Sequence, residues 1–407
     1  MEIIKTIIFF FLKLSKRFII SILKLCVIII LSPILYFNRI IPLKYRFTFG
    51  EFYSQRIGQF ACAFYVRYAE NYLKLSNPKC IYYLPKITSN DFLRELVVRN
   101  LNVFSWVKVL IYVSKKMPYL DCLVDNSVFY NGRDSKGLTR LTPKPKFKTS
   151  EVEFCHKWLR SNGWKGIGQP IICLHVRDSG YLEEYGGFND NDISFWNYHS
   201  YRDSEIIDYK KAVEWLLSEP QSAFVVRAGK SANQRLNISS DQLVDYPFSK
   251  DKNDLIDIWL FSNSDMVIST GSGPDVISSI FQVPTIYLNH LVLSDSYSWS
   301  KSLWSSKHLY WIHSGKHLTF EEYALANYHK TKDYFNYGIE IKNLTPDEIL
   351  NIVKDGWTYF IDNKPIKDDD IAVTDRVRGI FKNNKIIQSD NQWINPEWVI
   401  SSSWIPD

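Results

Sequence analysis

Polar residues suited to anion binding stand at the end of an apolar run in the middle of the chain. His175 and Arg177 lie two positions apart where Ile171–Val176 ends, so both are predicted to share one side of a strand end. Arginine presents a rigid fork of N–H donors that matches a diphosphate. We therefore predict that both residues contact the phosphates of a ligand. The alternative is a purely structural ion pair between Arg177 and the adjacent Asp178.

A second apolar run ends in a similar way. Ala223–Arg227 is followed by Gly229 and Lys230, so two cations and a small residue meet at a strand end. We predict that Arg227 and Lys230 also face the anion, and a solvated turn is the alternative. The segment is not a P-loop, because that motif requires a glycine where Phe224 stands.

A third run, Met266–Thr270, leads into a loop of small residues before a predicted helix over Asp275–Phe281. Small residues let backbone N–H groups approach a phosphate at the start of a helix. A dinucleotide fingerprint would place a third glycine where Val276 stands, which disfavours NAD. The loop residues predicted to bind the ligand are Ser269, Thr270, Gly271, Ser272, Gly273 and Asp275.

Helical patterns separate these apolar runs and set the predicted architecture. Apolar strands that alternate with helices indicate an α/β fold with a parallel sheet covered on both faces. In such sheets ligands bind beyond the carboxyl ends of the strands, where the polar residues above are found. Ser150 and Glu153 form a predicted capping box. The predicted helices are Ser150–Asn162, Ser204–Ser218, Asp254–Ser262 and Asp275–Phe281, and a fourth strand covers Thr285–Leu288.

A catalytic base would have to come from a carboxylate near those strand ends. The long polar and aromatic segment Gly186–Asp203 is typical of a lid or binding loop. The candidate bases are Asp178, Asp203 and Glu70, and the sequence does not rank them. A structural alternative exists for the second candidate, because Asp203 or Ser204 also suits the N-cap of the following helix.

Charge and cysteine usage exclude several classes of protein. The chain has 407 residues and a net charge of +6, but residues 1–50 hold eight basic residues and one acidic residue. The remainder is therefore close to neutral, unlike the body of a nucleic-acid-binding protein, and no nucleic-acid partner is expected. Six cysteines without a C-x-x-C pair indicate a reducing, cytoplasmic location for the body of the protein.

Metal ligation and a bound cofactor are not expected. His308, His313 and His317 are close in sequence, but a Ser-Gly pair interrupts any helix between the last two. The acidic run Asp368–Asp370 follows a Lys-Pro-Ile-Lys stretch rather than a buried strand. We therefore predict a solvated acidic turn at this position instead of a metal-binding D-x-D motif.

Residues 1–37 form a strongly apolar segment interrupted by cations. On a helix the cations fall within an arc of about 120° opposite an apolar face, which predicts a helix in the membrane interface, drawn to anionic lipid. Phe18–Phe37 has a single charge, so a membrane-spanning helix is the second possibility and a helix buried against protein the third. A cleaved signal peptide is not expected, because the apolar run is too long and lacks a cleavage site. The cations are Lys5, Lys13, Lys16, Arg17 and Lys24.

Composition divides the chain into four predicted parts. Residues 1–45 form the membrane anchor and 46–150 an N-terminal lobe, whose last segment, Asn131–Thr149, is a linker rich in Gly, Pro and Lys. Residues 151–345 form a nucleotide-binding lobe, and 346–407 a helix and tail expected to pack back on the N-terminal lobe. The predicted elements of the N-terminal lobe are helices over Tyr53–Lys74 and Asn90–Asn100 and a strand over Lys79–Leu84.

Together these motifs resemble a family of bacterial glycosyltransferases linked to surface-polysaccharide synthesis, over about residues 46–345. More distantly, the His-x-Arg after the first strand is similar to that of fucosyltransferase-type enzymes of the GT-B fold. The family pattern has a histidine after Arg-Ile-Gly, where Gln59 stands here. The segments that carry the resemblance are Arg56-Ile-Gly58, with Glu70 downstream, His175-Val-Arg-Asp, Tyr201-Arg-Asp-Ser, Arg227-Ala-Gly-Lys, Ser269-Thr-Gly-Ser-Gly and Val283-Pro284.

The resemblance implies a GT-B-like α/β fold, with two Rossmann-like lobes, a cleft between them and an N-terminal membrane-associated helix. It implies a metal-independent enzyme that moves a hexose or deoxyhexose from a nucleotide sugar to a glycan or lipid-linked acceptor. The cytoplasmic face of the bacterial inner membrane is the expected location. Arg177, Arg227, Lys230 and Gly271–Gly273 would stabilise the diphosphate, and the residues expected on the acceptor side are Arg56, Gly58, Tyr201 and Arg202.

Two other functions remain open from the sequence. The first is a membrane-anchored protein that binds a nucleotide or sugar without catalysis, which would keep the cations but need no base. The second is an NAD-linked enzyme that modifies a sugar nucleotide, against which Val276 counts.

Overall fold

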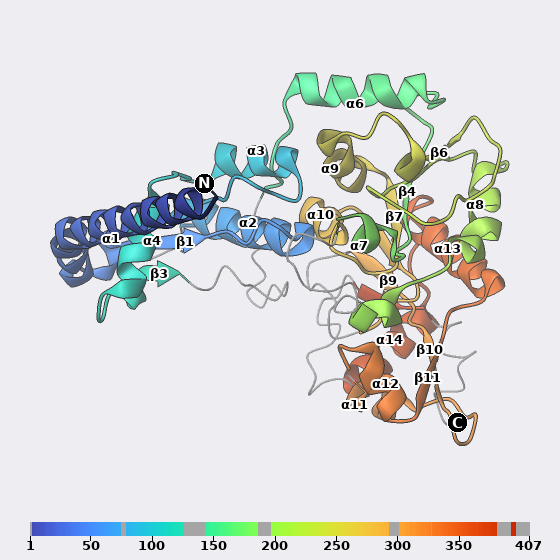
Figure 1. Cartoon of the computed structure of the whole chain (residues 1–407). Helices are drawn as coiled ribbons and strands as arrows, with labels where there is room; N and C mark the ends of the chain where they lie inside the picture. The colour runs from blue at the N-terminus through green and yellow to red at the C-terminus, as the bar shows by residue number, and fades with distance from the viewer. Residues whose placement is uncertain are drawn as a thin grey trace.

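The computed structural model describes residues 2–74, 79–125, 143–185, 197–292, 301–326, 328–380 and 392–395. Figure 1 shows a long N-terminal helix, a small α/β part that follows it, and a larger α/β part. Most of the predicted linker and most of the predicted binding loop before Asn197 lie outside the described residues.

The larger part is built on a seven-stranded sheet in which every pairing is parallel. This confirms the predicted α/β class. The chain runs outward from β4 to β5 and β6 and then returns to the other side of β4, so the strand order reverses between β4 and β7. The strands lie in the order β12 (Gln392–Ile394), β9 (Ser302–Trp304), β8 (Thr285–Tyr287), β7 (Met266–Ser269), β4 (Ile171–His175), β5 (Phe224–Arg227) and β6 (Leu243–Asp245).

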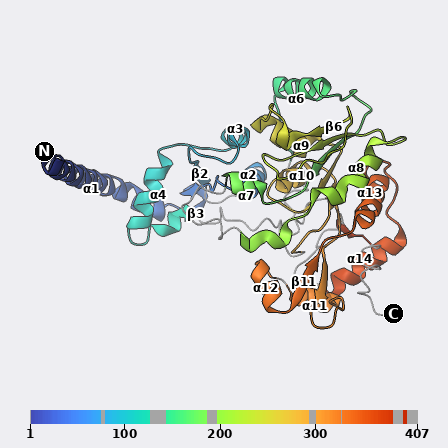
Figure 2. The same ribbon diagram turned by 45° about the vertical axis from the view of Figure 1, so that its right-hand side comes forward.

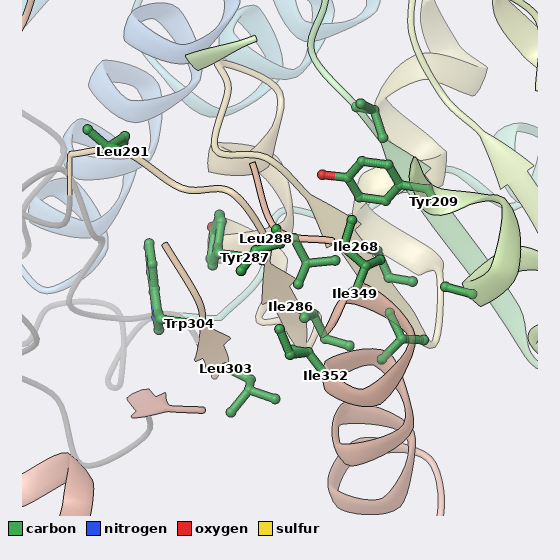
Figure 3. Packing of buried hydrophobic residues seen from close by; sticks show 14 of the residues in the cluster. Tyr209, Ile268, Ile286, Tyr287, Leu288, Leu291, Leu303, Trp304, Ile349 and Ile352 are labelled. Atoms are coloured by element: carbon green, nitrogen blue, oxygen red, sulfur yellow. The ribbon is translucent and has the colours of Figure 1, made fainter. Parts of the chain in front are cut away.

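Alternate residues of each strand enter different cores, which explains why these strands are apolar throughout. Ile172 and Leu174 of β4 pack on one face of the sheet, whereas Ile171 and Cys173 pack on the other. Figure 3 shows the first core, where Ile349 and Ile352 of α13 meet the sheet residues Ile268 and Ile286. The helices over the first face are α8 (Lys210–Leu217) and α13 (Pro346–Phe360), and those over the second are α6 (Thr149–Ser161), α9 (Asp254–Asn263) and α10 (Asp275–Phe281).

The N-terminal lobe is smaller than the Rossmann-like lobe that the resemblance implies. It holds a three-stranded parallel sheet in the order β2 (Lys79–Tyr83), β1 (Phe47–Glu51), β3 (Val124–Asp125). Its helices are α2 (Ile57–Tyr72), α3 (Asp91–Asn100) and α4 (Val107–Lys116). The predicted helices and strand of this lobe are confirmed, whereas β1 and α4 were not predicted.

The two lobes share one apolar core. Phe60 and Phe64 of α2 belong to the same buried cluster as Ile277 and Phe281 of α10. The helix α3 packs in the same way on α9. Apolar contact between the lobes therefore places the first turn of α2 against the loop that follows β7 (Figure 1).

Side chains cap the starts of three helices, and one predicted capping box is not formed. Asn90 accepts the Leu93 N–H at 2.8 Å and caps α3. Thr319 and Thr345 form capping boxes for α11 (Phe320–Leu325) and α13. The predicted box at Ser150 is wrong. Helix α6 starts at Thr149, because the Glu151 carboxylate accepts the Lys148 N–H at 2.8 Å.

The C-terminal segment packs on the larger lobe, so the predicted return to the N-terminal lobe is wrong for the described residues. Strand β12 extends the seven-stranded sheet beside β9, and α13 packs on α8. The predicted acidic turn is also wrong, because Asp368 opens helix α14 (Asp368–Ile380). Asp370 is buried and accepts a hydrogen bond from the Tyr359 hydroxyl, which holds α14 against α13.

The larger lobe also contains short elements. Among them are α7 (Gly180–Tyr185), 3-10 turns at Asn197–Arg202 and Ile206–Tyr209, the antiparallel pair β10 (His308–Trp311) and β11 (Ile339–Lys342), and α12 (Thr331–Asn336). The turn at Ile206–Tyr209 continues into α8, in agreement with the predicted helix over this region.

Helix α1 (Glu2–Ile40) projects from the N-terminal lobe as a long arm, with the N-terminus at its far end (Figure 2). Among the described residues, Ile19–Ile40 is the one helical segment long and apolar enough to cross a membrane, with a mean hydropathy of 2.5. Length and hydropathy alone do not decide between the three predicted locations of this segment.

Candidate functional site

His175 and Arg177, at the carboxyl end of β4, form hydrogen bonds with residues that follow β5 and β7. The two ring nitrogens of His175 lie 3.2 Å from the Ala228 carbonyl oxygen after β5 and 2.8 Å from the Ser272 hydroxyl after β7. The Arg177 backbone N–H donates to the Thr270 hydroxyl at 3.0 Å. This edge is the point where the strand order reverses, at which open parallel sheets bind ligands.

Three cations come together over this edge. Arg177 Nε donates to Asp203 Oδ1 at 2.9 Å, and Lys307 Nζ donates to the Asp203 backbone carbonyl at 2.5 Å. Arg202 donates to the Gly271 carbonyl. One carboxylate therefore sits among three positive charges drawn from three separate loops.

A fourth cation comes from the N-terminal lobe. His199 has its pKa lowered to about 3, first by burial and then by the charges of Arg202, Arg177 and Arg56. Arg56 is the residue before the first turn of α2. The His199 imidazole therefore lies in a positive potential, to which Arg56 of the N-terminal lobe and Arg177 and Arg202 of the larger lobe contribute. We call Arg56, Arg177, Arg202 and Lys307 the cation cluster.

Lys307 is the most buried member of the cation cluster. It is 3% exposed, and burial lowers its pKa to about 8. Asp203 favours the charged ammonium, Arg177 opposes it, and Glu205 and Asp208 favour it more weakly. A lysine in this state gains its full charge when an anion arrives, because the anion adds the stabilisation that water no longer provides.

Asp203 combines partial burial with positive neighbours. Burial raises the pKa of its carboxyl group above the usual value, while Arg177 and Lys307 oppose that rise. Its side chain keeps 26% exposure. A carboxylate that is accessible and held by a cation has the position required of a general base beside an anionic group.

The glycine-rich loop after β7 makes contacts within the chain. The Ser272 N–H donates to the Asp275 carboxylate, which also accepts from the Ser269 hydroxyl at 2.6 Å. These contacts engage loop donors within the chain, and the Gly271 carbonyl is turned toward Arg202. The described loop therefore supports the cation cluster, and its predicted contact with a phosphate stays a prediction.

Gly58 and Gly273 explain how the two lobes meet so closely. A Cβ on Gly58 would lie 2.8 Å from the Gly273 Cα, which is closer than real Cβ contacts. The first turn of α2 therefore rests directly on the backbone of the loop after β7. This contact places Arg56, two residues before Gly58, near the loop after β7, and its predicted acceptor-side role stays a prediction.

Arg227 and Lys230 are paired within the protein. Arg227 is 1% exposed, donates to Asp245 Oδ1 at 3.2 Å and lies 3.7 Å from an oxygen of Asp178. Lys230 Nζ donates to the Ser89 carbonyl at 2.8 Å and pairs with Asp254 at 3.0 Å. These contacts are structural, and the one between Lys230 and Ser89 joins the two lobes. The predicted binding of the donor by Arg227 and Lys230 stays a prediction.

The other two candidate bases, Glu70 and Asp178, are engaged by other partners. Glu70 pairs with Arg67 at 2.5 Å, and 12 positions separate it from Gly58, or about 18 Å along the α2 axis. The structure does not bring Glu70 to the strand ends. Asp178 accepts the Gly180 and Asn233 N–H groups at 2.9 and 3.0 Å, so its carboxylate organises the loops after β4 and β5.

Tyr201 belongs to the core rather than to a binding surface. It is 3% exposed and packs against Tyr334, with ring centroids 5.5 Å apart. Its backbone N–H donates to the Thr331 hydroxyl at 3.0 Å. These contacts fix the loop that carries the next two residues, Arg202 and Asp203, at the site.

Two residues at the site were missed. Lys307 follows β9 and His290 follows β8, so both stand at the same sheet edge as His175. His290 is 3% exposed and packs so tightly that a Cβ on Gly271 would lie 1.9 Å from its Nδ1. The signal was available for His290, because the strand before it was predicted. For Lys307 it was not, because β9 was not recognised.

Within the described residues, no group of three or more His, Cys, Asp or Glu side chains is placed to hold a metal ion. His308 pairs with Glu348 at 2.9 Å, and His317 packs on the Tyr310 ring with centroids 4.1 Å apart. The site chemistry that the described residues do offer is a set of cations around the Asp203 carboxylate, with Asp178, Glu205 and Asp208 nearby. The chain matches no protein-family model, no curated protein and no solved structure.

Proposed function

We propose that this protein is a GT-B-type glycosyltransferase that moves a sugar from a nucleotide-activated donor to a glycan or lipid-linked acceptor in bacterial surface-polysaccharide synthesis. The observation that carries the proposal is the cation cluster, which gathers four positive charges from both lobes over the edge where the strand order reverses. A nucleoside diphosphate is the ligand that such a site fits, because its phosphates need several charged donors at once.

The chemistry of transfer follows from these charges. Breaking the bond between the sugar and the diphosphate puts negative charge on the leaving phosphate oxygen. Arg177 and Lys307 would stabilise that charge from fixed positions, which is the usual means by which a site lowers such a barrier. The cluster supplies the positive charge that a metal ion provides in other phosphate sites.

The acceptor needs a base to remove its hydroxyl proton. Asp203 is the candidate that the contacts favour, because Asp178 is engaged by backbone N–H groups and Glu70 is distant. Its raised pKa brings Asp203 nearer to neutrality, where a base releases and takes protons most effectively. Arg56 would then lie on the acceptor side, since it comes from the N-terminal lobe.

A thermal-shift panel on the full chain with UDP, GDP, CMP, TDP and ADP, and with NAD as the control, tests the proposal. A ligand at about 100 times its dissociation constant adds about 2.7 kcal/mol, which raises the melting temperature by a few degrees. Stabilisation by one nucleoside diphosphate or monophosphate identifies the donor class for a transfer assay. Stabilisation by NAD alone would overturn the proposal, and nucleotide binding without transfer of the matching sugar would favour the non-catalytic alternative.

A further inference from the structure

The second half of α1 has two unlike sides. On one side Leu31 and Leu35 pack against Val107 and Ile111 of α4 in a small core of their own. On the other side a row of large apolar residues is 45–76% exposed. The exposed row consists of Ile22, Ile29, Ile30, Ile34, Phe37 and Ile40.

Both charged side chains and the amide of this half of α1 contact the lobe. Lys24 Nζ lies 5.8 Å from the centre of the Tyr112 ring, and the Arg39 guanidinium lies 5.4 Å from that of Tyr119. Asn38 Nδ2 donates to the Phe47 carbonyl at 2.8 Å. The charges and amides thus line the same side as the packing core and leave the opposite side apolar.

The lobe that holds α1 carries exposed charges close to the packing contact. Lys108, Lys115 and Lys116 of α4 are exposed, on the helix that packs directly on α1. A bilayer-spanning α1 would draw these ammonium groups into hydrocarbon, which is costly. A flat α1 keeps them in the head-group region, where anionic lipid attracts them.

We propose that α1 lies in the plane of a membrane surface containing anionic lipid, with the exposed apolar row in the acyl chains and the lobe on the water side. Charge complementarity selects this occupant, because the helix that packs on α1 carries the exposed lysines Lys108, Lys115 and Lys116, which suit anionic head groups. This proposed orientation of α1 does not depend on the proposed function, because it is argued from α1 and α4 and not from the cation cluster.

Site-directed labelling of the full chain tests the seating. A Cys26→Ser, Glu2→Cys variant is added to sealed phosphatidylcholine–phosphatidylglycerol vesicles and treated with an impermeant maleimide. Native Cys122, exposed on the lobe, is the internal standard. A flat helix predicts equal labelling of positions 2 and 122 before detergent. Labelling of position 2 only after detergent means that α1 spans the bilayer, and overturns the proposal.

A matched pair of substitutions tests whether the exposed apolar row of α1 contacts the membrane. Ile30→Lys and Ile167→Lys each place a charge at an exposed isoleucine, 65% and 98% exposed, the second on the larger lobe. The first should weaken vesicle binding at least about tenfold, and the second should leave it unchanged. Equal binding of both variants overturns the proposal. So does a wild-type chain that ignores the vesicles and instead forms a dimer that Ile30→Lys dissociates.

Discussion

Two arginines at neighbouring strand ends have opposite electrostatic surroundings. Arg227 closes β5, is 1% exposed and has the carboxylates of Asp245 and Asp178 around it. Arg177 follows β4 and shares its one carboxylate partner, Asp203, with other cations. The first charge is compensated and supports the fold. The second is repelled by another cation, Arg202, so an arriving anion would relieve that repulsion.

The largest expected effect comes from removing the compensated arginine. Arg227→Met should lower the free energy of unfolding by about 3 kcal/mol, because it leaves two carboxylates beside a buried position without their cation. Urea unfolding measures the change, and Arg235→Met, an exposed arginine over the same Phe248 ring, is the control. Wild-type stability with lost nucleotide binding would reverse the roles of the two arginines.

The next effect concerns the carboxylate within the cation cluster. Asp203→Asn keeps the backbone carbonyl that holds Lys307 but removes the base, so the transfer rate should fall at least about 100-fold with donor binding retained. Steady-state kinetics with the donor found by the thermal-shift panel measure it. Glu70→Gln is the paired control and should transfer at the wild-type rate. An equal loss in both variants would contradict the assignment.

Removing Arg177 should affect binding more than folding. Arg177→Ala should weaken binding of the nucleoside diphosphate about 30-fold, equivalent to about 2 kcal/mol for a charge-assisted contact. Calorimetric titration gives the affinity, and the unfolding free energy should change far less than in Arg227→Met. Unchanged affinity would remove Arg177 from the site.

The smallest effect is a pH dependence of binding. Lys307 has a pKa of about 8, so it loses its proton as the pH rises through 8, and the cluster loses one positive charge. Affinity for the diphosphate should therefore fall about fivefold between about pH 7 and pH 9. In Lys307→Met the affinity should be lower at pH 7 and the decline should disappear. A decline that persists in the variant would assign it to another group.

Local signals predicted the elements around β4, β5 and β7 because those elements follow local rules. Thr345 with Glu348 and Pro346 fixes the start of α13, and a continuous apolar run marks a strand buried on both faces. The signal fails for elements defined by partners far along the chain. Strand β12 has three residues and depends on pairing with β9 across 90 residues.

The site residues also divide into those that local sequence predicts and those whose roles depend on distant partners. His175, Arg177 and the loop after β7 were predicted because each follows a recognisable strand. The roles of Arg227 and Glu70 depend on contacts with Asp245 and Arg67, which position along the sequence does not reveal. Whether a cation is compensated is decided by tertiary neighbours, and spacing in the sequence carries no information on it.

The contact between Gly58 and Gly273 has a consequence for how this chain can change over time. The three atoms nearest to a Cβ added at Gly58 are all backbone atoms of Gly273, so no neighbouring side chain could shrink to make room for it. Contacts between core side chains change during evolution through pairs of compensating substitutions, and the contact at Gly58 offers no such pair. A larger lobe transplanted onto a different N-terminal lobe would have to meet a glycine at the same place.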